Sequence, residues 1–499
     1  MGINISNVWY LVLVLFPIIA GCGVLLFPKT KRTAMCVYTE AVTILTSVLS
    51  FIMLFNRPAE PITVIDFVGK YDVVFGFDGM GSIFAGLISF LWPLASLYAF
   101  DYMKHEANEK SCKESTFFGF YTMTFGITLG IAASANLLTM YVFYELLTLV
   151  TVPLIIFSLK REAVLATRTY LYYSLGGAAF GFVTLVFLAN YGETLAFTLG
   201  GVLGTGAEGH ETLLRLIYIF GFFGFGVKAA VFPLSGWLPK AGVAPTPVTA
   251  LLHAVAVVKS GAFAILRITY FCFGTELLRG SFAQFVPMIF VIFTIVYGCS
   301  QAVRERHFKR RLAYSTVSNL SYVLFGCLIM SPAGLIGALA HMVFHGIMKI
   351  CSFFGAGAVI AYTHKEYVYE LDGIGRKMPV TFAAFTVASL ALMGVPGLAG
   401  FISKWNLATA AVSSGNWLAY IGIGALLVSA LLTAIYMLQV VIRAFFPEQG
   451  FNPDSVAKIH DPNWKMLVPF IVFIIAIVYF GIFSGGFIGL LEKVAIGLF

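Results

Sequence analysis

The sequence is poor in charged residues. Asp, Glu, Lys and Arg make up 11% of its 499 residues, against roughly 25% in an average soluble domain. Its seven cysteines include no CxxC pair, so we expect them to be small packing residues rather than ligands of a metal or iron–sulfur centre. A Rossmann fingerprint and a P-loop are also missing. With 60% hydrophobic residues and a mean hydropathy of +0.92, the chain has the composition of a polytopic membrane protein.

Apolar windows, separated by charged or Gly/Pro-rich segments, predict an all-α protein with about 14 transmembrane helices. The expected spans lie near residues 8–27, 34–55, 78–100, 115–134, 138–158, 168–190, 213–232, 246–270, 283–302, 312–330, 334–362, 378–403, 416–442 and 466–490. The first window lacks a basic n-region and a cleavage site before or after it, so we expect a retained span rather than a signal peptide.

The net charge of +8 does not indicate nucleic-acid binding, because the basic residues are concentrated in every second loop. The odd-numbered loops carry 21 of the 31 Lys and Arg residues, whereas the even loops and the C-terminal segment carry five. Cytoplasmic loops of membrane proteins are enriched in Lys and Arg. The odd loops are therefore expected to be cytoplasmic, with both termini on the outer side.

The few charged residues inside the expected spans are the candidate functional residues. Glu145 is a lone carboxylate at bilayer depth, where it must be protonated or paired. Lys228 is its natural partner, because Pro233 and Pro239 interrupt the helix just beyond it and open a polar notch. The pair is expected to act as a charge switch that forms and breaks; the alternative is a static ion pair between helices.

His253 and Lys259 share the expected eighth span. Six residues separate them, which is about 9 Å along a helix and a turn of about 240°, so they do not share a face. A proton relay is the functional interpretation, whereas a satisfied buried histidine is the structural one.

His341, His345 and Lys349 follow one another at i, i+4 and i+8 in the eleventh span. This spacing places all three on one helix face, as proton hopping requires. A zinc site is the competing interpretation, but the helix offers neither a third ligand nor a general base.

The twelfth span contains Gly394, Pro396 and Gly397 as a second helix break, with Lys404 shortly after it. This arrangement is similar to that of Lys228 and predicts two inverted five-helix repeats, spans 4–8 and 9–13, with spans 7 and 12 broken. A lysine reaching the membrane surface is the alternative for Lys404. The predicted division of the chain is into N-terminal helices (1–114), a first repeat (115–270), a second repeat (271–445) and a C-terminal helix (446–499).

Two further charged residues have plainer interpretations. Glu40 lies about two turns from the cytoplasmic end of its helix, where it could form a surface ion pair or snorkel to the membrane surface. Arg267 lies near the outer end of its span and is expected to anchor the helix at the interface.

Taken in order, several segments resemble the antiporter-like membrane subunits shared by complex I, Mrp-type Na⁺/H⁺ antiporters and energy-converting membrane hydrogenases. They are YE at 144–145, GVKAAVFPLSGWLPKA, APTPVTALLHA, KRRLAYSTVSNLSY, HMVFHGIMK and GIGRKMP followed by GVPGLAGFISKW. The resemblance covers about residues 115–440. It implies the switch role for Glu145 and Lys228, a central relay lysine at 259, a second relay at 341, 345 and 349, and a terminal charged residue at 404. The long lateral helix of the largest complex I subunit is not expected.

The resemblance also implies a function and a place in the cell. We expect a subunit that translocates protons or exchanges Na⁺ for H⁺. It would belong to a redox-driven pump of the prokaryotic inner membrane, together with other membrane subunits. An Mrp-type antiporter without redox chemistry is the main alternative; an organic-solute transporter and a non-conducting spacer are two others. We expect no cofactor in this chain, with Fe–S clusters and [NiFe] or flavin only in partner subunits.

Overall fold

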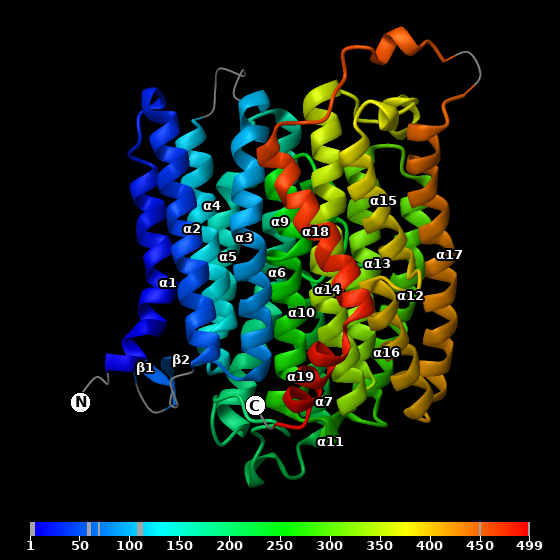
Figure 1. Ribbon diagram of the computed structural model, residues 1–499. Helices are drawn as coiled ribbons and strands as arrows, with labels where there is room; N and C mark the ends of the chain where they lie inside the picture. Colours follow the sequence, from blue (N-terminus) through cyan, green and yellow to red (C-terminus); the bar gives the residue numbers. More distant parts are fainter. Residues whose placement is uncertain (1–4, 57–60, 68–69, 107–112, 449–450, 498–499) are drawn as a thin grey trace.

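The chain forms a bundle of long, roughly parallel helices (Figure 1). The computed structural model describes residues 5–56, 61–67, 70–106, 113–448 and 451–497. Within these residues, ten helical segments are long and apolar enough to cross a membrane. The protein is therefore an integral membrane protein, as its composition predicts.

The N-terminal part contains three helices and one hairpin. These are α1 (Ile5–Val24), α2 (Arg32–Phe55), β1 (Ile62–Asp66), β2 (Asp72–Phe75) and α3 (Gly79–Glu106). The two strands pair antiparallel, with Ile62 opposite Phe75. An all-α chain was expected, so the hairpin is a correction: ITVID and DVVF are short, β-branched segments, which favour strands.

The first interrupted region follows α4 (Glu114–Ala132), α5 (Leu137–Ile155) and α6 (Arg161–Tyr191). The next helices are α7 (Glu211–Gly226), α8 (Trp237–Ala241), α9 (Thr246–Ala254) and α10 (Val257–Arg267), followed by a π-helical segment, Ile268–Phe273. The chain between α7 and α8 is non-helical, around the cis bond of Pro233. The expected eighth span is one continuous helix in the sequence pattern but is split between α9 and α10 in the structure.

The remaining helices include a second interruption. They are α11 (Thr275–Leu278), α12 (Phe282–Arg304), α13 (Phe308–Leu328), α14 (Pro332–Thr363), α15 (Pro379–Met393), α16 (Ala399–Ser413), α17 (Trp417–Phe445), α18 (Trp464–Ile482) and α19 (Gly485–Ala495). Five short 3₁₀ turns lie at Lys29–Lys31, Thr205–Ala207, Val368–Glu370, Ile374–Arg376 and Pro453–Val456. The expected C-terminal span is divided into α18 and α19.

Backbone groups in the first interruption are satisfied by the protein itself. The indole of Trp237 donates to the carbonyl of Val227 at 2.7 Å, and the amide of Phe232 donates to Thr294 Oγ1 at 3.1 Å. Irregular backbone at membrane depth is stable only when its polar groups find such partners. The interruption is therefore stabilised by hydrogen bonds within the protein interior.

Helix α14 is the central helix of the second half. It packs against α3, α9, α13, α15, α16, α18 and α19, and nearly all its side chains are buried. Titratable side chains on this helix therefore face protein on every side and not lipid.

The start of α1 and the helix α19 lie at the lower end of Figure 1, whereas the links from α1 to α2 and from α17 to α18 lie at the upper end. The beginning and end of the described chain are thus on one side of the bundle. Two of the basic odd-numbered loops, the one with Lys29 and Lys31 and the one with Lys458, belong to the opposite side.

Arg267 is not an interfacial anchor. Its side chain is 1% exposed, and both its terminal nitrogens donate to the carboxylate of Asp78, at the start of α3. The rings of Phe197, Phe263 and Phe271 lie 4.4–4.9 Å from its guanidinium carbon. The sequence pattern placed Arg267 correctly near a helix end, but Asp78 and Phe197, which help to bury it, come from elsewhere in the chain.

Candidate functional site

Lys228 lies two residues beyond α7, at the start of the first interruption. It is 1% exposed, its ammonium donates to the backbone carbonyl of Tyr144, and it lies 3.3 Å from the centroid of the Tyr144 ring. A carbonyl and an aromatic face both stabilise a buried cation. The lysine is thus held against α5 at the residue before Glu145.

Glu145 is near Lys228 but not in contact with it. The two side chains interact electrostatically, yet among the described ion pairs none joins them within 4.0 Å. One carboxylate oxygen of Glu145 is buried without a hydrogen-bond partner. The predicted switch residues are therefore adjacent, with the lysine bonded to a backbone carbonyl in place of the carboxylate.

Lys259 and His345 form the centre of the site. Lys259 comes from α10 and His345 from α14; both are completely buried, and the lysine ammonium is hydrogen-bonded to His345 Nδ1. A neutral imidazole accepts at one nitrogen while the other remains free to exchange a proton. His345 Nε2 is buried and has no partner among the described atoms.

His341 continues this line toward α16. Its ring centroid lies 5.7 Å from that of His345, as expected for residues four apart on one helix face. Its Nδ1 lies 2.9 Å from Ser403 Oγ, and its ring lies against Tyr322. Ser403 directly precedes Lys404 on α16.

Lys404 caps the C-terminal end of α15. Its ammonium donates to the carbonyls of Leu392 at 2.6 Å and Met393 at 3.1 Å. The last carbonyls of a helix lack intrahelical partners and attract cations. Its position is thus determined by the second interruption, where Gly394 and Gly397 adopt φ values of +94° and +85° that other residues rarely adopt.

Lys349 belongs to a branch of hydroxyl groups rather than to the histidine line. Its ammonium donates to Ser315 Oγ at 2.6 Å, which also accepts from the hydroxyl of Tyr436 at 2.7 Å. The Tyr436 hydroxyl oxygen also lies 3.2 Å from Thr433 Oγ1. The sequence interpretation missed Ser403, Ser315 and Tyr436, because serine and tyrosine are too common in helices to stand out without a charged neighbour.

His253 is not hydrogen-bonded to this line among the described atoms. It is fully buried on α9, both ring nitrogens are without partners among the described atoms, and its ring packs on Phe353 at 4.8 Å. Lys259 and Lys349 are close enough to act on it electrostatically. The structure thus places it beside the site without a hydrogen bond to any member of it.

A polar cleft of about 990 Å³ lies at the end of the bundle that carries the basic loops. Charged residues of both signs line it, among them Lys240, Glu305 and Lys309. Lys309 Nζ donates to the carbonyl of Ala244 at 3.1 Å, in the segment that leads into α9. Water therefore has access to the backbone next to the first interruption.

The line consists of groups that can accept and donate protons. The described residues contain no group of three His, Cys, Asp or Glu side chains that could hold a metal ion. They contain instead a line of exchangeable groups from Lys259 through both histidines to Ser403 and Lys404.

Residues 134–433, more than half of the chain, match the family of NADH:quinone oxidoreductase and Mrp antiporter membrane subunits. The chain belongs to this family. The matched segment contains every residue of the line described above, and the resemblance read from the sequence motifs is thereby confirmed.

Relatives and solved structures agree with this membership. NADH-quinone oxidoreductase subunit N of Desulforudis audaxviator is 32% identical over 411 residues, which cover 80% of this chain and 79% of the relative. An Mrp complex from Dietzia sp. contains a chain of the same fold, with a TM-score of 0.84, 19% identity and coverage of 99% of this chain and 98% of that one. A chain of the archaeal membrane-bound sulfane sulfur reductase has a TM-score of 0.82, 20% identity and coverage of 98% and 97%. The antiporter-like fold thus spans the whole of this family member.

Proposed function

We propose that this chain translocates protons as one antiporter-like subunit of a multi-subunit, redox-driven pump in the prokaryotic inner membrane. The observation that carries the proposal is the buried line from Lys259 through His345 and His341 to Ser403, which ends beside Lys404. Buried titratable groups on neighbouring helices are expensive at membrane depth and mark ion pathways. No organic substrate is needed to account for them.

Protons would pass along this line by hydrogen-bond exchange. Lys259 gives a proton to His345 Nδ1, and His345 releases one from Nε2 on its far side. His341 then receives it and passes it to Ser403 and Lys404. Lys349 and its hydroxyl neighbours lie one turn from His345 and provide a second exit or a store for the proton.

The pair of Glu145 and Lys228 would control the charge on Lys259. With Lys228 bonded to the Tyr144 carbonyl, the carboxylate of Glu145 is left incompletely satisfied. Movement of the ammonium onto Glu145 would neutralise the pair and reduce the positive potential at Lys259, which would favour protonation of Lys259. Return of Lys228 to the carbonyl would favour release.

We further infer fourteen spans and two inverted repeats. The support is the position of the interruptions: α7–α8 is the fourth element of the first five-span unit and α15–α16 is the fourth of the second, each with a lysine beside the break. Because five is odd, a repeated five-span unit enters the membrane from the opposite side. Equivalent broken helices in two halves are typical of inverted-repeat transporters.

The basic-loop end of the bundle would face the cytoplasm, and both termini the outer side. The polar cleft at that end would then supply protons from the cytoplasm to the segment before α9. We expect Fe–S clusters with [NiFe] or flavin only in partner subunits.

An Mrp-type Na⁺/H⁺ antiporter subunit is the second candidate. The observation in its favour is the fit to a chain of the Mrp complex over 99% of this chain. The name of the Desulforudis relative favours the redox-driven assignment. The two candidates use the same proton line and differ in what drives it.

The test is proton transport by the native complex in sealed vesicles. Glu145→Gln and Lys228→Ala should leave the complex assembled and reduce proton transport at least tenfold. The control is Glu211→Gln, which replaces an exposed acid at the start of α7 and should have no effect. Unchanged transport in both variants would refute the switch. Repeating the assay with and without Na⁺, and with a protonophore, separates proton pumping from exchange.

A further inference from the structure

Glu40 is a second carboxyl at membrane depth, outside the segment 134–433 that matches the family. It lies on α2, which packs against α1, α3 and α4. Its carboxylate is 2.5 Å from Ser96 Oγ on α3, and no ion pair to it is found among the described residues. The surface pair expected from the sequence is therefore not what satisfies it.

The immediate neighbours of Glu40 are uncharged oxygens. Ser96 Oγ lies 3.4 Å from Thr43 Oγ1 and 3.0 Å from the carbonyl of Pro93. The hydroxyl of Tyr121 on α4 is close enough to feel the charge of Glu40, and it is buried without a partner. The cationic group that acts on Glu40 is Lys465 of α18, at longer range than a hydrogen bond. Cys36 is the titratable neighbour on the preceding turn.

Further buried polar atoms lie on α2 and α3, the two helices that the hydrogen bond between Ser96 and Glu40 joins. The following atoms have no hydrogen-bond partner among the described residues: Thr39 Oγ1, Ser47 Oγ and Ser50 Oγ on α2, and Ser89 Oγ and Trp92 Nε1 on α3. The backbone carbonyl of Ser89 is a further acceptor, because Pro93, four residues later, has no amide hydrogen to donate to it. The distance along α2 from Glu40 to Ser50 is about 15 Å at 1.5 Å per residue.

Such unpaired polar atoms favour water. An unsatisfied buried polar group costs about 1–3 kcal/mol, and a bound water lowers that cost by supplying a hydrogen-bond partner. Apolar residues would serve equally well if this interface only held two helices together.

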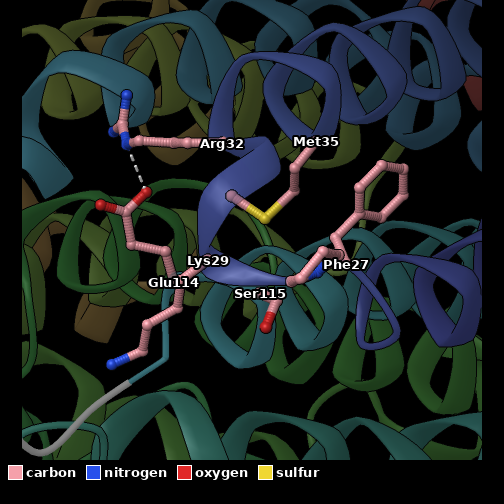
Figure 2. Close-up of a pocket in the computed structure, with 7 residues that line it drawn as sticks. Phe27, Lys29, Arg32, Met35, Glu114 and Ser115 are labelled. Carbon is pink, nitrogen blue, oxygen red and sulfur yellow. Dashed lines mark hydrogen bonds and ion pairs between the residues drawn. The ribbon is translucent and has the colours of Figure 1, made fainter.

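Glu40 lies near a pocket at the basic-loop end of the bundle. A pocket of about 110 Å³ is lined by Phe27, Lys29, Arg32, Met35, Glu114 and Ser115, among others (Figure 2). Arg32 and Glu114 form an ion pair there at 2.6 Å. Met35 is five residues before Glu40, which is about 7.5 Å along the helix. Solvent at the basic-loop end thus comes within about two turns of the carboxyl.

We propose that Glu40 is a proton-binding carboxyl of a separate, hydroxyl-lined path between α2 and α3, loaded from the pocket at Arg32 and Glu114. A single carboxyl among neutral hydroxyls is most stable at this depth when it carries a proton. The path runs from Glu40 past Ser96 and Ser89 to Ser47 and Ser50. It shares no residue with the line through Lys259 and His345.

The test uses dicyclohexylcarbodiimide, an apolar reagent that modifies protonated carboxyl groups, on the whole complex in native membranes near neutral pH. Peptide mapping by mass spectrometry should find Glu40 modified. Glu114 should remain unmodified, because its carboxylate is engaged in the ion pair with Arg32. Glu40 is partly exposed, so the reagent can reach it.

Two results would overturn the proposal. Unmodified Glu40 would show that the carboxyl is ionised, and protection of Glu40 by added Na⁺ but not by K⁺ would assign the site to sodium. A carboxyl C=O infrared band that is present in the wild type and lost in Glu40→Gln provides a second readout, which should shift but persist in Ser96→Ala. Both readouts are independent of proton transport, so they stand or fall separately from the function proposed for the central line.

Discussion

Gly400 provides a sharp test of the second interruption. It lies on α16, one turn before Lys404, where α16 passes the end of α15. A Cβ at this position would overlap the carbonyl oxygen of Ala391 and lie 3.1 Å from Met348 Sδ. The carbonyl belongs to helix backbone and cannot move away alone, so Gly400→Ala must push α16 outward by on the order of 1 Å.

That displacement acts on the hydrogen bonds of the next two turns. Lys404 to the Leu392 carbonyl, at 2.6 Å, and Ser403 to His341, at 2.9 Å, both cross the seam between α16 and its neighbours. We expect Gly400→Ala to cost about 1–3 kcal/mol of stability and to reduce proton transport at least tenfold, since a 1 Å misplacement of reacting groups can cost about a hundredfold.

The matched control is Gly424→Ala on α17, where an added Cβ meets no atom within 4 Å. Both substitutions place alanine in a helix, which by itself favours folding by about 1 kcal/mol. Melting temperature of the purified complex and transport in vesicles measure the two effects. Wild-type stability and transport in Gly400→Ala would show that the seam is loose and refute the reasoning.

Two other predictions concern ion pairs away from the central line. Asp78→Asn should destabilise the protein by about 2 kcal/mol, because it leaves the guanidinium of Arg267 buried without a carboxylate; Arg267→Met should cost less, since Asp78 is 35% exposed and water can reach it. Equal melting temperatures for the two variants would contradict this asymmetry. The loop residue Glu366 has its pKa lowered from 4.5 chiefly by its hydrogen bond with His307, so it adds stability above the ordinary carboxyl pKa, and this contribution is lost as the pH falls through the lowered value. Glu366→Gln should therefore reduce the free energy of unfolding slightly at pH 7, by about a few tenths of a kcal/mol because the side chain is 53% exposed, and a small drop in melting temperature would show it. The difference from wild type should shrink as the pH falls through the lowered pKa; a difference that grows on acidification would contradict the sign.

Hydrophobicity and charge made the membrane class readable from the sequence, because the cost of charge in lipid leaves few exceptions. The same cost drew attention to Glu145, Lys228, Lys259 and Lys349 without any structural information. Pro and Gly indicated both interruptions, since their effect on a helix is local. The division of the eighth span between Ala254 and Val257 carried no such signal, because the residues there are Val and Ala.

Contacts between distant segments could not be read from the sequence. Arg267 looked like an anchor because its partner, Asp78, is 189 positions earlier, and Glu40 looked like a surface residue because Ser96 is 56 positions later. The hydroxyls that extend the site, such as Ser403 and Ser315, gain their meaning only from the side chains opposite them.

The sequence by itself determined that the chain spans a membrane, that Pro and Gly interrupt two of its spans, and which titratable residues lie where charge is costly. Each of these follows from the solvation or backbone chemistry of single residues and short segments. The tertiary structure alone decided which of those residues touch: that Lys259 meets His345, that Lys228 is bonded to Tyr144 rather than Glu145, and that His253 stands apart. Contacts of this kind depend on how helices far apart in the chain pack. Two side chains touch only when the helix faces that carry them meet, and the sequence pattern does not say which faces meet.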